Sequence, residues 1–240
     1  MTFLAHAIGP AVSPAPATTG LRGRTLRRII APEPALGLWA TGWDGPPGPL
    51  GREDAFGHHA IVAAIAAAGP CLPVRFGSWL ADEAAAIDLL TGREEAFRAG
   101  LGRVAGRSEL AVTLIWRESP VVAGRGHAVP ATPAGAGGAG RRFLEARRLD
   151  QAETAARRET AEALAGDIVA LLRDLGTPPA DVRHETCPTS EVALSLSALI
   201  PTAEASGVKE AVSRLAGGLA AVRGVVSGPW PPYSFTADLT

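Results

Sequence analysis

Cysteine, lysine and aromatic residues are all scarce in this 240-residue chain. The two cysteines, Cys71 and Cys187, lie far apart, so neither a disulfide framework nor a cysteine-based zinc cluster is expected. Lys209 is the only lysine, which we interpret, with the richness in alanine and glycine, as a bias in base composition. Because aromatic residues make up only 5% of the chain, a segment in which several of them gather is informative.

Long apolar runs and an excess of one charge are also lacking. No uninterrupted apolar stretch approaches the ~18 residues of a membrane-spanning helix, and no basic segment precedes the apolar start of the chain. A net charge of −1 does not favour nucleic acid or an acidic membrane surface as a partner. With 47% hydrophobic and 20% charged residues, the chain can bury a core, and we expect a folded protein of the reducing cytoplasm.

The first half of the sequence mixes the periodicities of strands and helices. Helices are predicted to begin at Arg52 and at Asp82, the first ending at Gly69-Pro70 and the second interrupted at Gly92. Strands are predicted at residues 2–8, 26–30, 36–43, 72–76 and 110–116. This pattern indicates an N-terminal α+β domain, which we assign to residues 1–107.

The second half begins with a plain stretch of proline, glycine and alanine, residues 118–140, which predicts a flexible loop. A long helix over residues 141–175 follows, with one apolar stripe along it. The stripe consists of Leu149, Ala152, Ala156, Leu164, Ile168, Leu171 and Leu175. Strands at 181–187 and 192–199, a helix at 208–221 and a strand at 222–226 complete an order that is ferredoxin-like or a variant of it. We therefore expect a two-domain α+β protein whose C-terminal domain, residues 108–240, is ferredoxin-like.

The end of the chain concentrates aromatic side chains on a proline-rich backbone. Residues 228–235 read Gly-Pro-Trp-Pro-Pro-Tyr-Ser-Phe, and three prolines in so short a space predict that the last strand ends at about Gly228. The chain is then expected to continue as an extended, polyproline-like segment. Rings on a stiff backbone lose little entropy on burial, so Trp230, Tyr233 and Phe235 are expected to anchor this segment, either to the rest of the chain or to another protein.

Three patterns invite a catalytic or ligand-binding interpretation. His58 and His59 are adjacent on a predicted helix and diverge by about 100°, so they are poorly placed to share a metal. We expect one to be partly buried and bonded to a carboxylate or carbonyl, and the other to be solvated. Arg75 lies in an apolar predicted strand, where a buried guanidinium needs a carboxylate or carbonyl partner, and a structural role is favoured over catalysis.

The third pattern is Gly-Ala-Gly-Gly-Ala-Gly at residues 135–140, which fits Gly-x-Gly-x-x-Gly with Glu159 about twenty positions later. A dinucleotide site needs a strand before the glycines and an acidic residue at the end of a second strand. Here the preceding residues are loop-like and Glu159 lies in the predicted long helix. We therefore expect no cofactor, no metal and no enzymatic activity, an enzyme using Arg75 with His58 or His59 being the disfavoured alternative.

Several of these segments together resemble the GvpF/GvpL family of gas vesicle proteins. They are His58-His59 ahead of Gly-Pro-Cys-Leu-Pro-Val-Arg-Phe-Gly at 69–77, the strand from Glu109 to Trp116, Phe-Leu-Glu-Ala-Arg at 143–147 and the octapeptide at 228–235. The resemblance covers most of the chain. It implies an α+β N-terminal domain, a modified ferredoxin-like C-terminal domain, and no enzymatic activity or cofactor.

The resemblance further implies a minor component or assembly factor of gas vesicles in the cytoplasm. It would contact the major shell protein GvpA and other gas vesicle proteins, and no nucleic acid, membrane or small-molecule substrate. The alternative is a general protein-interaction scaffold with no role in gas-filled vesicles. The long helix and the segment Trp230–Phe235 are the candidate surfaces, and the residues expected to bind a partner or to anchor the structure are Arg75, Phe76, Trp230, Tyr233 and Phe235.

Overall fold

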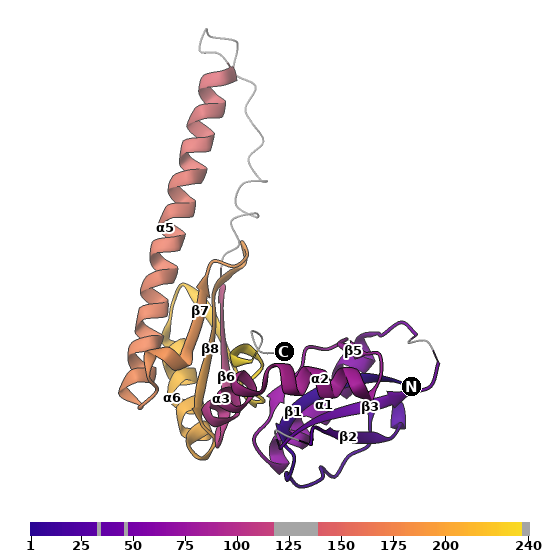
Figure 1. Ribbon diagram of the computed structural model, residues 1–240. Coiled ribbons are helices and arrows are strands. Elements are labelled where there is room, and N and C mark those ends of the chain that lie inside the picture. Colours follow the sequence, from indigo (N-terminus) through magenta and orange to yellow (C-terminus); the bar gives the residue numbers. More distant parts are fainter. Residues whose placement is uncertain (33–34, 46–47, 118–138, 237–240) are drawn as a thin grey trace. The chain divides into compact units, whose positions relative to one another are not determined.

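The computed structural model describes residues 1–32, 35–45, 48–117 and 139–236 (Figure 1). The chain divides into two compact units. The first comprises Met1–Glu109, Leu199–Ala205 and Pro229–Thr240, and the second comprises Leu110–Ala198 and Ser206–Gly228. The C-terminal segment, residues 230–236, therefore belongs to the same unit as the N-terminal part of the chain.

An antiparallel sheet and three helices make up most of the described part of the first unit (Figure 1). The strands are β1 (Thr2–Pro10), β2 (Leu26–Ile30), β3 (Leu36–Trp43), β4 (Leu72–Pro73) and β5 (Trp79–Leu80). They follow the order β2-β3-β1-β4, and β5 also pairs with β1. The helices are α1 (Arg52–Ala68), α2 (Glu83–Gly92) and α3 (Glu94–Val104), with 3₁₀ turns η1 (Leu21–Gly23) and η4 (Tyr233–Phe235).

Strand β1 is buried on both faces and changes its alternation halfway along. It pairs antiparallel with β3, and the register shifts between Ala5 and Ala7, so that His6 is the extra residue of a β-bulge. Phe3 and Ala5 lie in one core cluster with Ile8, whereas Leu4 lies with Ala7 in another. Before the bulge, the odd-numbered residues face the cluster that contains Phe3. After the bulge, the even-numbered Ile8 faces that cluster and the odd-numbered Ala7 faces the other.

The two clusters occupy opposite faces of the sheet. One joins Leu4 and Ala7 of β1 to Ile61 and Ile65 of α1. The other receives Leu90 of α2 and a larger set from α3, β4 and the C-terminal segment; its members there are Phe97, Leu101, Val104, Leu72 and Phe235. A buried sheet with helices on both faces explains why its strands read as near-continuous apolar runs.

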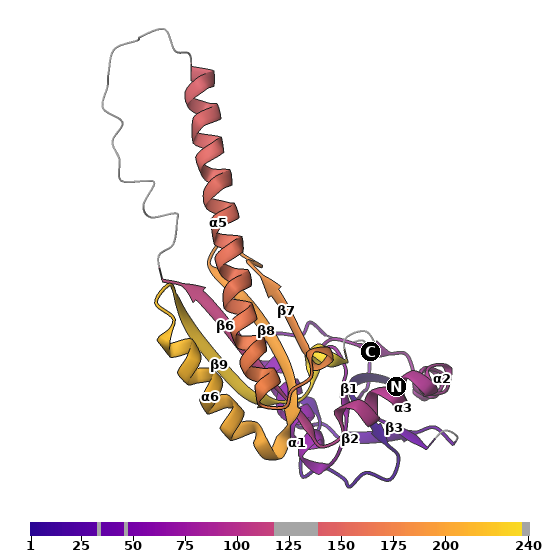
Figure 2. The ribbon, with the colours of Figure 1, turned by 90° about the vertical axis from the view of Figure 1, so that its left-hand side faces the viewer.

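The second unit is built around another sheet, of order β7-β8-β6-β9. Its elements, some of which begin or end in residues of the first unit, are β6 (Arg107–Trp116), α5 (Ala139–Asp174), η2 (Pro179–Asp181), β7 (Val182–Thr186), β8 (Val192–Pro201), α6 (Ala205–Gly218) and β9 (Val222–Trp230). The 3₁₀ turn η3 (Thr202–Glu204), between β8 and α6, lies in the first unit. Strands β7 and β8 are antiparallel, and α5 and α6 lie on the same face of the sheet (Figures 1 and 2). Among the described residues, no helix combines the length and apolarity that crossing a membrane requires.

Only the C-terminal half of α5 packs on this sheet, while its N-terminal half extends beyond it (Figure 2). Leu164 and Ile168 of the predicted stripe are buried, together with Ala161, Ala165 and Leu172. Leu149, which was predicted to belong to the same stripe, is 73% exposed. The predicted stripe is therefore packed only in its C-terminal part, because the apolar periodicity continues past the end of the sheet.

The mixed α+β prediction is confirmed, and two strand predictions need correction. The strand expected at 72–76 spans only Leu72–Pro73, because a turn at Phe76-Gly77, where Gly77 has φ 88°, redirects the chain. The last strand was expected to end at about Gly228, but β9 continues to Trp230. Since β9 is the edge strand of its sheet, Pro229 can lie in it although it has no N–H to donate. The loop predicted at 118–140 and the glycine pattern at 135–140 fall almost entirely outside the described residues.

Candidate functional site

The C-terminal segment, residues 230–236, is fastened to the first unit through a buried carboxylate. Glu109, at the start of β6, accepts hydrogen bonds from the Ser234 N–H at 2.8 Å and from the Ser234 hydroxyl at 2.7 Å. Glu109 is only 5% exposed, and a buried carboxylate is stable only where donors surround it. The two bonds therefore fix the backbone of the segment and satisfy the charge of the carboxylate.

Two further contacts fix the end of the segment. The Phe235 ring is 4% exposed within the cluster that contains Phe97 and Leu101 of α3, and the Arg103 guanidinium lies 5.4 Å from its centroid. The Thr236 hydroxyl donates to the backbone carbonyl of Pro73 at 3.2 Å. Residues 233–235 form a 3₁₀ turn, so the prediction of an extended, polyproline-like conformation fails from Tyr233 onward.

The other two rings surround His59 of α1. The Tyr233 hydroxyl lies 3.1 Å from His59 Nδ1, and burial is the main cause that raises the pKa of Tyr233 above its ordinary range. The Trp230 ring meets the His59 ring edge to face, with centroids 5.2 Å apart, and remains 40% exposed. His59 is half-buried under these rings, so the expectation of a solvated histidine was wrong.

His58, the neighbouring histidine, belongs to a buried polar chain that begins in β1. Its Nε2 lies 3.1 Å from the carbonyl oxygen of Val74, and its Nδ1 lies 2.9 Å from Nδ1 of His6. His6 Nε2 lies 2.7 Å from the hydroxyl of Thr41, which also accepts the Leu21 N–H at 2.9 Å. The prediction that one histidine is buried and bonded to a carbonyl is confirmed for His58.

Only one arrangement of protons satisfies this chain. A carbonyl can only accept, so His58 carries its proton on Nε2 and accepts at Nδ1 when neutral. His6 must then donate from Nδ1 and accept at Nε2 from the Thr41 hydroxyl. Protonating His58 would place two N–H groups against each other unless His6 changes its tautomer, and protonating His6 would require the Thr41 hydroxyl to turn its proton away and accept instead. Burial is the main cause that lowers the pKa of His6 to about 3 and that of His58 to about 4, with the charge of His58 lowering His6 further.

Helix α1, which supplies both histidines, is fixed at its first turn by Asp54. The Asp54 carboxylate accepts two hydrogen bonds of 2.7 Å from Arg22 and one of 2.8 Å from the Gly51 N–H. These donors, Arg22 first, lower the pKa of Asp54 to about 2. Asp54 and His58, four residues apart, share a helix face, but the carboxylate pairs with Arg22 and not with the histidine.

Arg75 and Phe76 lie in the turn that follows β4. Arg75 is exposed, and within the described residues its guanidinium forms no hydrogen bond or ion pair, so the prediction of a buried, paired arginine was wrong. The strand expected at 72–76 is shorter than predicted for the same reason: the chain leaves the sheet after Val74 and enters the turn that exposes Arg75. The Phe76 ring is half-buried and meets the His58 ring at 5.4 Å.

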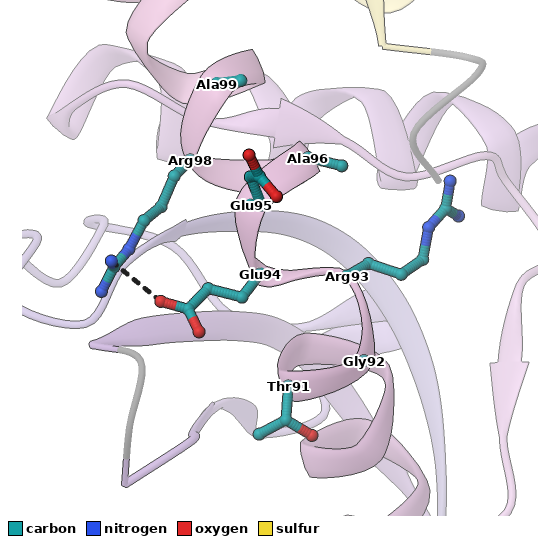
Figure 3. Close-up of a pocket in the computed structure, with 8 residues that line it drawn as sticks. All are labelled: Thr91, Gly92, Arg93, Glu94, Glu95, Ala96, Arg98 and Ala99. Carbon is teal, nitrogen blue, oxygen red and sulfur yellow. Dashed lines mark ion pairs between the residues drawn. The ribbon is translucent and has the colours of Figure 1, made fainter.

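A hollow of about 780 Å³ lies at the junction of α2 and α3, but few side chains there are placed to bind a ligand or to catalyse a reaction (Figure 3). Glu94 is paired with Arg98 at 2.8 Å, and Arg93 and Arg98 extend to opposite sides. No group of three or more metal-ligating side chains exists among the described residues. Burial raises the pKa of Cys71 to about 12, which makes it an unreactive thiol. The C-terminal segment and its surroundings are therefore the candidate site.

Two residues of this site, Glu109 and His6, were not identified as site residues from the sequence. Glu109 was noted only as the start of a strand, although a carboxylate beside an apolar run is a signal for a buried acceptor. His6 sits in an apolar strand, and the bulge that turns it toward His58 leaves no trace in the sequence.

Replacing Glu109 by glutamine is expected to lower the free energy of unfolding of the first unit by about 1–3 kcal/mol. One oxygen acceptor becomes an NH₂ donor, which faces a Ser234 donor and leaves it unsatisfied. Urea denaturation measures the change, and the exposed Glu53→Gln on α1 is the matched control. A Glu109→Gln protein as stable as the control would show that the carboxylate does not fasten the segment.

Comparison with known proteins gives one consistent answer. The family model described as gas vesicle synthesis protein GvpL/GvpF matches residues 9–237. The solved structure of the gas vesicle protein GvpF from Anabaena sp. PCC7120 is similar, with a TM-score of 0.74, 17% identity, and coverage of 98% of this chain and 95% of that one. GvpF from Microcystis aeruginosa is also similar, with a TM-score of 0.70, 15% identity and coverage of 98% of both chains. No curated protein matches the sequence.

Proposed function

Because the chain belongs to the GvpL/GvpF family of gas vesicle synthesis proteins, we propose that it acts by binding the major shell protein GvpA and other gas vesicle proteins while vesicles form in the cytoplasm. It would be a minor structural component or an assembly factor. The observation that carries the proposal is the family match across residues 9–237, which includes both compact units and the C-terminal segment.

The physical task of such a protein follows from the chemistry of a small, very hydrophobic shell protein. Exposed apolar strands pair edge to edge and aggregate, so a subunit awaiting assembly needs a temporary cover. A protein that binds these surfaces reversibly would keep them apart until the shell grows. Such a role needs exposed apolar and aromatic side chains on a rigid support, and no reacting group.

The C-terminal segment offers a support of this kind. Trp230 borders a hollow of about 490 Å³ whose other walls include small and apolar side chains. Among these are Ala63, Ala66 and Ala67 of α1, together with Pro231 and Pro232. Exposed tryptophans beside apolar hollows are frequent anchors of protein interfaces. The exposed half of α5, with Leu144 56% and Leu149 73% exposed, is the second candidate surface.

We also propose that the C-terminal domain, residues 108–240, has a modified ferredoxin-like fold. The order of its elements (β6, α5, β7, β8, α6, β9) and the sheet order β7-β8-β6-β9 support this assignment. The compact units support a boundary near Glu109. They also lead us to revise the expected range of 108–240, moving the segment from Pro229 onward out of the C-terminal domain and into the N-terminal domain of residues 1–107.

Co-purification tests the function. The tagged full chain is expected to retain GvpA from a mixture with the other gas vesicle proteins, and deletion of its gene is expected to abolish light-scattering particles that collapse under pressure. Normal particles in the deletion strain, with no gas vesicle protein retained, would refute the proposal. Those results would favour a general interaction scaffold instead.

A further inference from the structure

A hollow of about 570 Å³ lies beside the C-terminal segment, and its lining differs from that of the apolar hollow next to Trp230. The side chains that line it include His58, His59, Pro73, Arg75, Phe76 and Tyr233. All belong to the first unit. Aromatic and proline surfaces thus meet a cationic side chain at one place.

Most polar groups around this hollow are already occupied. His58 uses both ring nitrogens, toward His6 and Val74, and the Tyr233 hydroxyl bonds to His59. The carbonyl of Pro73 accepts the Thr236 hydroxyl. Two groups remain within the described part of the chain: Nε2 of the half-buried His59 ring, and the exposed guanidinium of Arg75, which forms no hydrogen bond or ion pair there.

Within the described residues, no acidic side chain of α1 or of the start of β6 pairs with Arg75, and Glu53 of α1 is exposed to solvent. At the start of α1, Asp54 is bound by Arg22, and at the start of β6 both oxygens of Glu109 are bound by Ser234. A guanidinium bonds a carboxylate through two parallel N–H groups, and the rings of Phe76 and Tyr233 favour an apolar neighbour for that carboxylate. Phosphate sites usually gather several cations or backbone N–H groups, whereas this hollow offers one guanidinium on an apolar wall.

We propose that the hollow at Arg75 binds an acidic segment of a partner protein, an aspartate or glutamate that pairs with Arg75 while an adjacent apolar side chain packs on Phe76 and Tyr233. This inference rests on the proposed function in that the partner is expected among the gas vesicle proteins. The site is distinct from the apolar surface at Trp230, so one partner could be held through both.

The test uses the full chain and a panel of fluorescent, end-blocked pentapeptides in which glutamate is flanked by leucine or phenylalanine. Binding is expected to be at least tenfold tighter for a glutamate peptide than for its glutamine counterpart, and to weaken at high salt. Arg75→Gln is expected to remove this preference, and Arg75→Lys to retain part of it. Arg98→Gln, an exposed arginine on α3, is the matched control and should leave the preference unchanged.

Equal binding of glutamate and glutamine peptides, an unchanged preference in Arg75→Gln, or equally strong binding of inorganic phosphate would each overturn the proposal. Co-purification with GvpA distinguishes a failure of the Arg75 site from a failure of the proposed function. Gas vesicle proteins retained equally by the wild type and Arg75→Gln, without acidic-peptide binding, would overturn the site alone. Acidic-peptide binding at Arg75 in a chain that retains no gas vesicle protein would support the site and overturn the proposed function.

Discussion

Replacing Phe235 by alanine is expected to lower the free energy of unfolding of the first unit by about 3–5 kcal/mol. The ring is 4% exposed and packs in the same cluster as Phe97 and Leu101 of α3 and Leu72 of β4, so its removal leaves a cavity in the main core. The effect is expected to exceed that of Glu109→Gln, because a cavity and a large loss of apolar burial combine. Urea denaturation followed by tryptophan fluorescence gives the value.

The control for this change is Phe56→Ala. Phe56 lies on α1 and is 61% exposed, so its replacement is expected to change the free energy of unfolding by about 0.5 kcal/mol or less. If Phe235→Ala were as mild as Phe56→Ala, the C-terminal segment would not be part of the core, and the placement of η4 would be wrong.

Mild acid is expected to destabilise the first unit through the buried pair of His6 and His58. Their folded pKa values are lowered, to about 3 and about 4, so the unfolded chain binds protons at a higher pH than the folded one. The contribution of the two neutral histidines to the free energy of unfolding is therefore fully present above pH ~6.5. It is lost as the pH falls from there toward the folded pKa values. For each histidine, the free energy of unfolding falls by about 1.4 kcal/mol per pH unit below its unfolded pKa. The pair is therefore expected to lower the free energy of unfolding by about 2–3 kcal/mol at pH 5.5.

Two measurements check this expectation. Urea denaturation at pH 7.5 and pH 5.5 gives the loss of stability. Nitrogen-15 NMR of the imidazole rings should show His6 protonated on Nδ1 and His58 on Nε2, with neither signal titrating between pH 7.5 and 5.5 while the protein is folded. Titration of either ring near pH 6.5 in the folded protein would contradict the proton arrangement.

Local patterns predicted the elements better than their contacts. The strands at 26–30 and 36–43 have the predicted bounds, and α1 begins at Arg52 as expected, since propensity, alternation and glycine-proline signals all act within a few residues. The prolines of the C-terminal segment gave a poorer guide. An edge position in the sheet tolerates Pro229, and only the completed sheet shows that β9 is at its edge.

The site itself depended on contacts between distant residues. An arginine between Val74 and Phe76 suggests burial, but the turn after β4 exposes it, and no local signal distinguishes the two outcomes. The partnership of His6 with His58 requires both a bulge in β1 and the packing of α1 over it. The three rings of the C-terminal segment could be recognised as anchors in general, whereas their division into buried Phe235 and half-exposed Trp230 could not.

In the proposed function, Ser234 and Phe235 fasten the segment, and Trp230 contacts other proteins. The most direct test measures thermal unfolding and GvpA co-purification together for Trp230→Ala. We expect a Tm within about 2 °C of the wild type and at least a tenfold loss of GvpA binding. A marked fall in Tm with GvpA still retained would contradict it, because Trp230 would then serve the fold alone.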